Sequence, residues 1–97
     1  MASFEIIFKQ SVAKDLRQIP KKDVVRILKC IDALRAEPRP SGAEKLSGQE
    51  KYRIRQGVYR ILYEIKNNEL IVVVVKIGHR RDVHYLHLIV RPGRTEL

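Results

Sequence analysis

The sequence predicts an α+β domain in which two helices pack on one face of a small antiparallel sheet, in the order β-α-α-β-β-β. Two segments with helical spacing of apolar residues lie between residues 11 and 36. Three β-like runs joined by short turns follow between residues 51 and 77. Helices that precede an antiparallel meander cover one sheet face and leave the other face open. The chain has 97 residues, of which 44% are hydrophobic, and we expect a single domain over residues 1–97.

The N-terminal half is expected to supply one strand and two helices. Residues 4–8 place two phenylalanines and an isoleucine on one face of an extended segment, which predicts the first strand. Ser11 can begin a helix that Pro20 ends. A second helix is predicted from about residue 22 to residue 36. Its apolar residues follow the i, i+3, i+4, i+7 spacing of a buried face: Val24, Ile27, Leu28, Ile31 and Leu34.

The C-terminal half is expected to form a three-stranded meander. Residues 51–66 read as a hairpin around Gln56-Gly57, because glycine supplies the positive φ that two-residue hairpin turns need. Asn67-Asn68 suits a second two-residue turn, since asparagine tolerates positive φ. That turn pairs residue 66 with residue 69 and begins a third strand, residues 69–77.

Strand parity sorts the meander into two faces, because successive side chains point to opposite sides. The expected core face carries Tyr59, Ile61, Tyr63, Ile65, Leu70, Val72 and Val74. The other face carries Arg53, Arg55, Arg60, Leu62, Glu64, Val73, Val75 and Ile77. Glu64 lies four residues from Arg60, roughly 13 Å along the strand, too far for shared proton transfer.

The second face gathers arginines. The predicted register sets Arg53 directly opposite Arg60, with Arg55 diagonal to both. The third strand ends beside the start of the second, so the following loop brings Arg80 close to them. Like charges opposed across strands are destabilising. We therefore predict that this face holds an anion.

The composition narrows the class of partner. A net charge of +9 and a pI of about 10.1 favour nucleic acid, an anionic membrane surface or an acidic protein. The longest apolar run, residues 70–75, is far shorter than the roughly 20 residues that span a bilayer. We expect no signal peptide and no membrane association. The single cysteine, Cys30, is expected to be a small packed side chain in a cytoplasmic protein.

The residues favour phosphate chemistry without a metal or cofactor. The only histidines are His79, His84 and His87, and the sequence offers no ligand cluster around them. Guanidinium groups bind phosphate through paired hydrogen bonds and stack on bases, which suits single-stranded RNA. They could stabilise the charge that develops when a 2′-hydroxyl attacks the adjacent phosphate. A group with a pKa near 7 would move the proton.

The chain resembles a RelE-type toxin of the RelE/ParE superfamily over nearly its whole length. The matching segments are VAKDLRQIP, KLSG, YRIRQGVYRILYEI and VVKIGHRRDVHY. The resemblance implies a small basic α+β toxin encoded with an antitoxin. RelE-type members cut mRNA in the ribosomal A site by 2′-hydroxyl attack without a metal. ParE-type members share the fold but poison DNA gyrase, and a non-catalytic RNA- or ribosome-binding module is a third reading.

The resemblance also implies site residues. Arg53 and Arg55 match two basic positions on one strand, Arg60 matches the arginine at the scissile phosphate, and Arg80 matches the arginine after the last strand. Some members have lysines at the first two positions, whereas an arginine is a poor base. The common ending GHRRDVY has tyrosine where this chain has His84, followed by Tyr85.

These departures leave the proton-transfer group open between His84 and Tyr85. A histidine titrates near pH 6.5 and can act as acid or base, while a tyrosine can stack on a base or donate a proton. A surface histidine without a role is equally consistent with the sequence. Further residues expected to contact RNA are Lys45, Lys51, His79 and Arg81, although His79 begins its loop and would otherwise only shape it.

The expected protein partner is an acidic, RelB-like antitoxin. It would place an amphipathic helix along the exposed sheet edge or the helices of the toxin. The tail, residues 86–97, either contacts this antitoxin or packs against its own domain, and its secondary structure is not predicted. We expect the other partners to be mRNA and the ribosomal A site.

Overall fold

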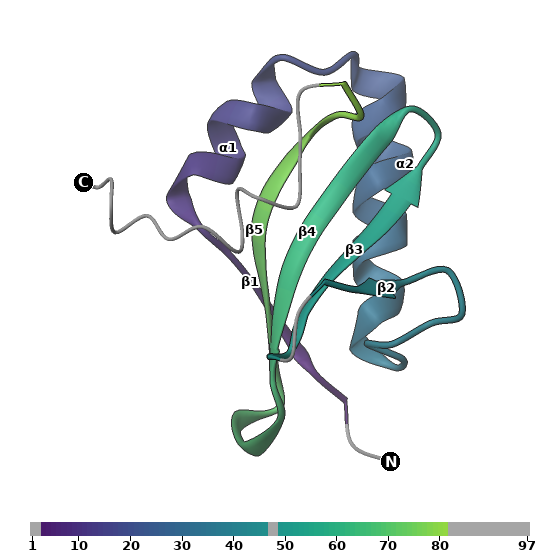
Figure 1. The fold of residues 1–97 in the computed structure, drawn as a ribbon. Helices are drawn as coiled ribbons and strands as arrows, with labels where there is room; N and C mark the ends of the chain where they lie inside the picture. Colours follow the sequence, from purple (N-terminus) through teal and green to yellow (C-terminus); the bar gives the residue numbers. More distant parts are fainter. Residues whose placement is uncertain (1–2, 47–48, 82–97) are drawn as a thin grey trace, which may run out of the picture.

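The fold is taken from a computed structural model, which describes residues 3–46 and 49–81 (Figure 1). The elements in chain order are β1 Glu5–Phe8, α1 Gln10–Arg17, α2 Lys21–Asp32, the 3₁₀ turn η1 Ala33–Arg35, β2 Glu44–Lys45, β3 Lys51–Gln56, β4 Tyr59–Lys66, the 3₁₀ turn η2 Asn67–Glu69 and β5 Ile71–His79. The predicted α+β class and the two helices before the meander are confirmed. The second predicted helix covers both α2 and η1.

The sheet is mixed and larger than predicted. Its strand order is β1-β5-β4-β3-β2, and β1 pairs with β5 in parallel, with Glu5 opposite Ile71. The expectation of a purely antiparallel sheet was therefore wrong. The connection through both helices carries the chain from the β1 edge of the sheet to the opposite edge. The meander then returns strand by strand, and β5 reaches β1 running in the same direction. The two-residue strand β2 was not predicted and extends the opposite edge.

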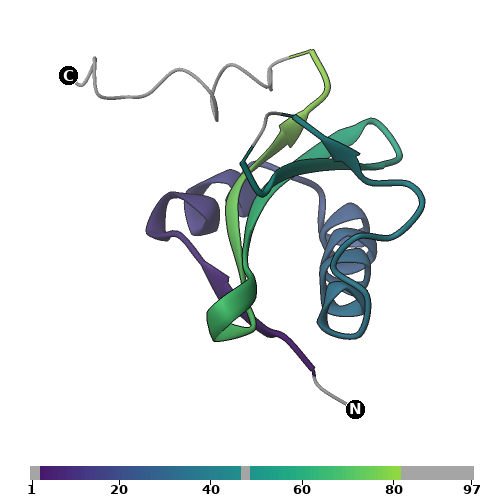
Figure 2. The same cartoon turned by 60° about the horizontal axis from the view of Figure 1, so that its bottom comes forward.

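The core lies between the helices and one face of the sheet. Both helices contribute side chains to one core cluster against the sheet, whose curvature is visible in Figure 2. The buried residues are Val12, Ile27, Ile31, Leu34, Tyr52, Ile54, Ile61, Tyr63, Ile65, Val72, Val74 and Ile77. Cys30 packs against this cluster as expected. Of the predicted helix stripe, Leu28 was placed wrongly, because it is 40% exposed.

The β3–β4 turn lies one residue later than predicted. Gln56 pairs with Tyr59, so the turn residues are Gly57 and Val58. Gly57 has φ +63° and occupies the first turn position, where a type II′ turn requires glycine. As a result, each residue of β3 pairs with a β4 residue two positions later than predicted. A shift of two positions leaves every side chain on its predicted face. The arginines therefore stay on one face, which a one-residue change in loop length would have prevented.

The β4–β5 connection is longer than predicted and is followed by a bulge. It uses η2 and Leu70, whose φ of +55° is left-handed, so Lys66 pairs with Ile71 and not with residue 69. A register shift between Leu62 and Tyr63 then reverses parity for the end of β5. Ile77 therefore lies in the core opposite Ile61, and its predicted place on the arginine-bearing face was wrong.

Among the described residues, no helix is both long and apolar enough to cross a membrane.

Candidate active site on the open sheet face

Four arginines converge at one end of the sheet face that the helices leave uncovered. We call Arg53, Arg55, Arg60 and Arg80 the arginine cluster. Arg55 lies directly opposite Arg60, and Arg53 lies opposite Leu62, diagonal to Arg60. The predicted register had Arg53 opposite Arg60 and Arg55 diagonal to it, so these two arginines have exchanged places. The backbone N–H of Arg80 donates to the carbonyl of Val58 at 2.7 Å, which ties the end of β5 to the β3–β4 turn.

Arg60 lies among the positive charges of the other three arginines in the cluster. Burial lowers the pKa of the Arg60 guanidinium, and the charges of Arg53, Arg55 and Arg80 lower it further. Glu44 opposes this shift. All four groups still carry a positive charge at neutral pH. Since each neighbour disfavours the charged form of Arg60, an incoming anion would relieve the repulsion.

The arginines occupy two different environments. The side chain of Arg53 is only 12% exposed and forms an ion pair with Glu44 of β2. Arg55 and Arg80 are exposed and line a hollow with Gly57, Tyr59 and Arg60. The hollow measures about 380 Å³, at the small end of ligand pockets. Arg53 therefore lies near Arg60 without lining the hollow, while Arg55, Arg60 and Arg80 line it.

A small apolar cluster supports the open face. Leu62 is fully buried and packs with Leu46 and Val75. It follows Arg60 by two positions and therefore lies on the same side of β4. Because the base of the face is closely packed, the arginine backbones are held in place.

The structure separates the other residues expected to contact RNA. Lys51 lies on the open face opposite Glu64, at the other end of the β3–β4 pair. Arg81 is exposed beyond β5. Lys45 opposes Tyr52, a core-face residue, so it does not share the face of the arginine cluster.

His79 shapes its loop. It pairs with Tyr59 at the end of β5, and the two rings lie edge to face with their centroids 6.0 Å apart. Its Nδ1 accepts a hydrogen bond from the backbone N–H of Arg81 at 3.2 Å. His79 lines a second hollow, on the helix side, with Asp15, Gln18 and Lys76. This position favours the alternative in which His79 holds the loop.

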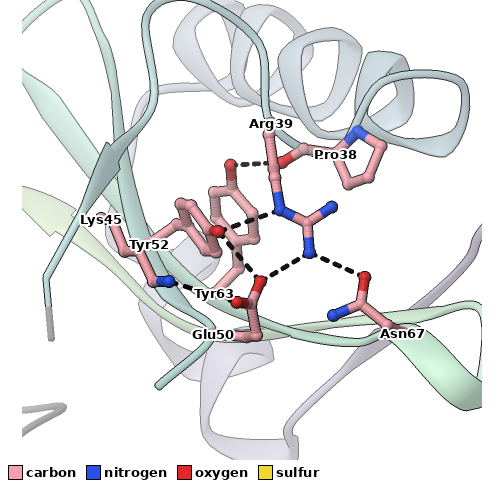
Figure 3. A network of polar contacts seen from close by, with 7 residues as sticks. All are labelled: Pro38, Arg39, Lys45, Glu50, Tyr52, Tyr63 and Asn67. Atoms are coloured by element: carbon pink, nitrogen blue, oxygen red, sulfur yellow. Dashed lines mark hydrogen bonds and ion pairs between the residues drawn. The ribbon is translucent and has the colours of Figure 1, made fainter. Parts of the chain in front are cut away.

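Sequence reasoning missed a polar network at the opposite end of β3 (Figure 3). Arg39 donates to the Tyr52 hydroxyl at 2.9 Å, to Glu50 at 2.5 Å and to Asn67 at 2.7 Å. Lys45 joins through Glu50 at 3.2 Å. Hydrogen bonds from Arg39 and Tyr52 lower the pKa of Glu50 to about 2. Arg39 stands between two prolines in a loop, and no sequence pattern connects it to residues 11 and 28 positions away.

Tyr59 was also missed as a site residue. Tyr59 lines the hollow of the arginine cluster, and its hydroxyl donates to Asp23 of α2 at 3.4 Å. The candidate proton-transfer residues His84 and Tyr85, and the tail of residues 86–97, lie outside the described residues. Among the described residues, no group of three His, Cys, Asp or Glu side chains could hold a metal ion.

Comparison with known proteins establishes the family. A family model of the ParE toxin of the type II toxin–antitoxin system parDE matches residues 6–84. The chain belongs to this toxin family. Two curated relatives, putative toxin RelE1 of Methanocaldococcus jannaschii and toxin RelG of Mycobacterium tuberculosis, are each 26% identical over 85 residues. Those alignments cover 84% of this toxin and 94% and 95% of the relatives.

Solved structures agree with this placement. The M. tuberculosis RelBE2 complex has a TM-score of 0.73 at 24% identity, covering 82% of this toxin and 94% of that chain. The RelE–RelB complex of Pyrococcus horikoshii OT3 has a TM-score of 0.71 at 26% identity, covering 82% and 98%. A double arginine-to-alanine mutant of Escherichia coli RelE in the free state has a TM-score of 0.70 at 23% identity, covering 84% and 87%. The family match and these likenesses place the toxin in the RelE/ParE superfamily, as its motifs predicted.

Proposed function

We propose that this toxin is a ribosome-dependent endoribonuclease that cleaves mRNA in the A site. One observation carries the proposal: Arg55, Arg60 and Arg80 line a single hollow on the open sheet face, beside Arg53. Three guanidinium groups around one small hollow suit a phosphodiester, since each can donate two parallel hydrogen bonds to phosphate oxygens. The sequence relatives named RelE1 and RelG support the same class of toxin.

The proposed reaction uses the RNA's own nucleophile. The 2′-oxygen attacks the adjacent phosphorus, forming the P–O2′ bond as the P–O5′ bond breaks. The products are a 2′,3′-cyclic phosphate and a free 5′-hydroxyl. A base takes the proton from the 2′-hydroxyl, and an acid returns one to the O5′ leaving group. The cluster stabilises the negative charge of the phosphorane, so no metal is required for that role.

The acid and base are proposed to come from outside the arginine cluster. An arginine stays protonated and is a poor base, even where burial and neighbouring charges lower its pKa, as at Arg60. His84 remains the preferred proton-transfer residue, and Tyr85 the alternative. Single-turnover cleavage of ribosome-bound mRNA by His84→Ala and Tyr85→Phe, followed across pH, decides between them. A parental rate and pH profile for His84→Ala would assign the histidine no acid–base role.

A gyrase poison is the second candidate, favoured by the match to the ParE family model. The two functions separate in one experiment. Inducing the toxin alone should arrest growth, and primer extension should map cuts within translated codons. Arg60→Ala should abolish both effects, while Arg35→Ala, at the far end of the helix layer, should abolish neither. Intact mRNA together with inhibited supercoiling would establish the gyrase function. Intact mRNA, bound RNA and normal growth would indicate a non-catalytic module.

The proposed protein partner is an acidic, RelB-like antitoxin in the cytoplasm, where ribosomes and mRNA are found. Similar structures are RelB–RelE complexes from P. horikoshii and M. jannaschii. The net charge of +9 suits an acidic partner. Exposed apolar side chains on β1 and α2 offer contacts for its amphipathic helix: Ile7, Phe8, Val25 and Leu28. The tail remains an alternative contact, and deletion of residues 86–97 with undiminished antitoxin affinity would exclude it.

A further inference from the structure

We infer that the RNA strand held at the arginine cluster continues over the β3–β4 turn onto α2, where a row of cations contacts its phosphates. We call Lys22, Arg26 and Lys29 the α2 row. This inference rests on the proposed function and extends it, because it gives the nucleotides beyond the cleaved linkage a binding site.

Two adjoining hollows define the path. The first is the hollow of the arginine cluster, lined in part by Gly57 and Tyr59. The second is lined by the same two residues together with Gln56, Val58, Asp23 and Arg26. Figure 1 shows the β3–β4 turn at the same end of the molecule as the start of α2. The turn is therefore the shared wall of the two hollows, and a chain leaving the first enters the second.

The α2 row has its middle member, Arg26, at the second hollow and follows the helix to either side. Its members are spaced i, i+4 and i+7, so they lie on one side of α2, and all three are exposed. The row extends about 10 Å along the axis, at 1.5 Å per residue. Like charges at this spacing destabilise a helix, as opposed arginines destabilise a sheet. Both arrangements keep cations together at a cost that a bound polyanion offsets.

The nearest carboxylate does not neutralise the row. Asp23 lies 3.8 Å from Arg26, and the Arg26 side chain stays 66% exposed. Asp23 also accepts the hydrogen bond from Tyr59 at 3.4 Å, so its negative charge is shared between the two. An exposed ion pair of this kind contributes little. Among the described residues, Lys22 and Lys29 have no ion pair within 4 Å.

The test compares RNA of two lengths that cannot be cleaved. Fully 2′-O-methylated, fluorescein-labelled oligonucleotides of about four and about ten nucleotides are bound to the full-length toxin over a range of salt. We expect replacement of the α2 row by glutamine to leave the affinity for the short probe unchanged. For the long probe, the log–log salt slope should fall in magnitude by about 2, at roughly 0.7 for each phosphate that is no longer neutralised.

A matched variant removes the same charge elsewhere. Lys9, Arg35 and Lys66 are exposed and line neither hollow. Arg35 is paired with Asp32 three residues before it, as Arg26 is with Asp23. Their triple glutamine variant should retain the slope of the parent. An equal fall in both triple variants would overturn the path, because it would show a general effect of net charge.

The remaining outcomes separate this inference from the proposed function. If Arg60→Ala leaves the affinity for the short probe unchanged, the proposed RNA site itself fails. If Arg60→Ala weakens binding of the short probe but the α2 row variant keeps the parental slope with the long one, only the path fails. The path is also overturned if the α2 row variant keeps that slope and binds the antitoxin more weakly, because the row is then a protein contact.

Discussion

At the scale of single residues, the pairing of Arg55 with Arg60 across two strands favours anion binding but destabilises the folded toxin. Like charges directly across a strand pair are unfavourable. Arg55→Gln should therefore raise the urea midpoint of the free toxin and reduce RNA cleavage. Lys51→Gln is the matched change, because Lys51 faces Glu64, so it should lower the midpoint or leave it unchanged. Equal shifts from both variants would show that the arginine pair carries no repulsion.

Glu50 makes an acid-dependent contribution to stability. Its pKa lies near 2 in the folded toxin and near its ordinary value of 4.5 in the unfolded chain. The depressed pKa stabilises the fold above pH 4.5, and this contribution disappears as the pH falls towards 2. Glu50→Gln should therefore flatten the dependence of the free energy of unfolding on pH between 4.5 and 2. Glu69→Gln should retain the parental dependence of the free energy of unfolding on pH in this range. An equally steep dependence in both variants would show that Glu50 is not its source.

At the scale of elements, the β3–β4 turn depends on one backbone conformation. Gly57 has φ +63°, and a β-carbon added there would meet no atom within 4 Å, so alanine is strained only by its backbone. We expect Gly57→Ala to destabilise by about 1–2 kcal/mol in urea unfolding. Gly42 has equal space and no positive φ, so Gly42→Ala should be neutral or slightly stabilising. Similar decreases at both sites would exclude turn strain as the cause.

Asp15 joins α1 to the bulged end of β5. Its carboxylate accepts the Ile77 backbone N–H at 3.1 Å and the Lys76 ammonium at 3.0 Å, and its side chain is 12% exposed. A carboxylate late in a helix is unfavourable for the helix dipole, so this tertiary contact explains its position. Asp15→Ala should destabilise the toxin by about 1.5–3 kcal/mol in urea unfolding. Asp32→Ala, at a carboxylate 71% exposed, should change stability by about 0.5 kcal/mol or less.

The elements also show what the sequence could predict. Alternation and helical spacing identified both helices and the meander, and the arginine cluster was predicted correctly because the misplaced turn preserved parity. The bulge beside Leu62 could not be predicted, because the alternation of apolar residues along β5 carries no sign of it and the nearby contact of Asp15 with the Ile77 N–H is distant in sequence. Pairing of β1 with β5 depends on where the helices return the chain. Lys45 was misassigned because the strand that orients it has only two residues.

At the scale of the whole molecule, the toxin has a helix-covered face and a cationic face, and net charge alone does not distinguish them. Binding to ribosomes should weaken steeply with salt. Arg60→Ala should reduce the magnitude of the log–log slope by about 0.7, one phosphate contact on single-stranded RNA. Light-scattering or filter-binding titrations with ribosomes measure this slope, with Arg35→Ala as the control. An unchanged slope for Arg60→Ala would remove Arg60 from the phosphate site.

The position of Arg80 beyond β5 also governs when the arginine cluster can form. Glu5 cannot find Ile71 until most of the chain has been synthesised, and contacts so distant in sequence form slowly. Arg80 completes the hollow and follows β5. The helices and the β3–β4 hairpin therefore come from chain that is synthesised before the arginine cluster can be completed. The pairing of β1 with β5 then completes the sheet, and its large separation in sequence makes it one of the slower contacts to form.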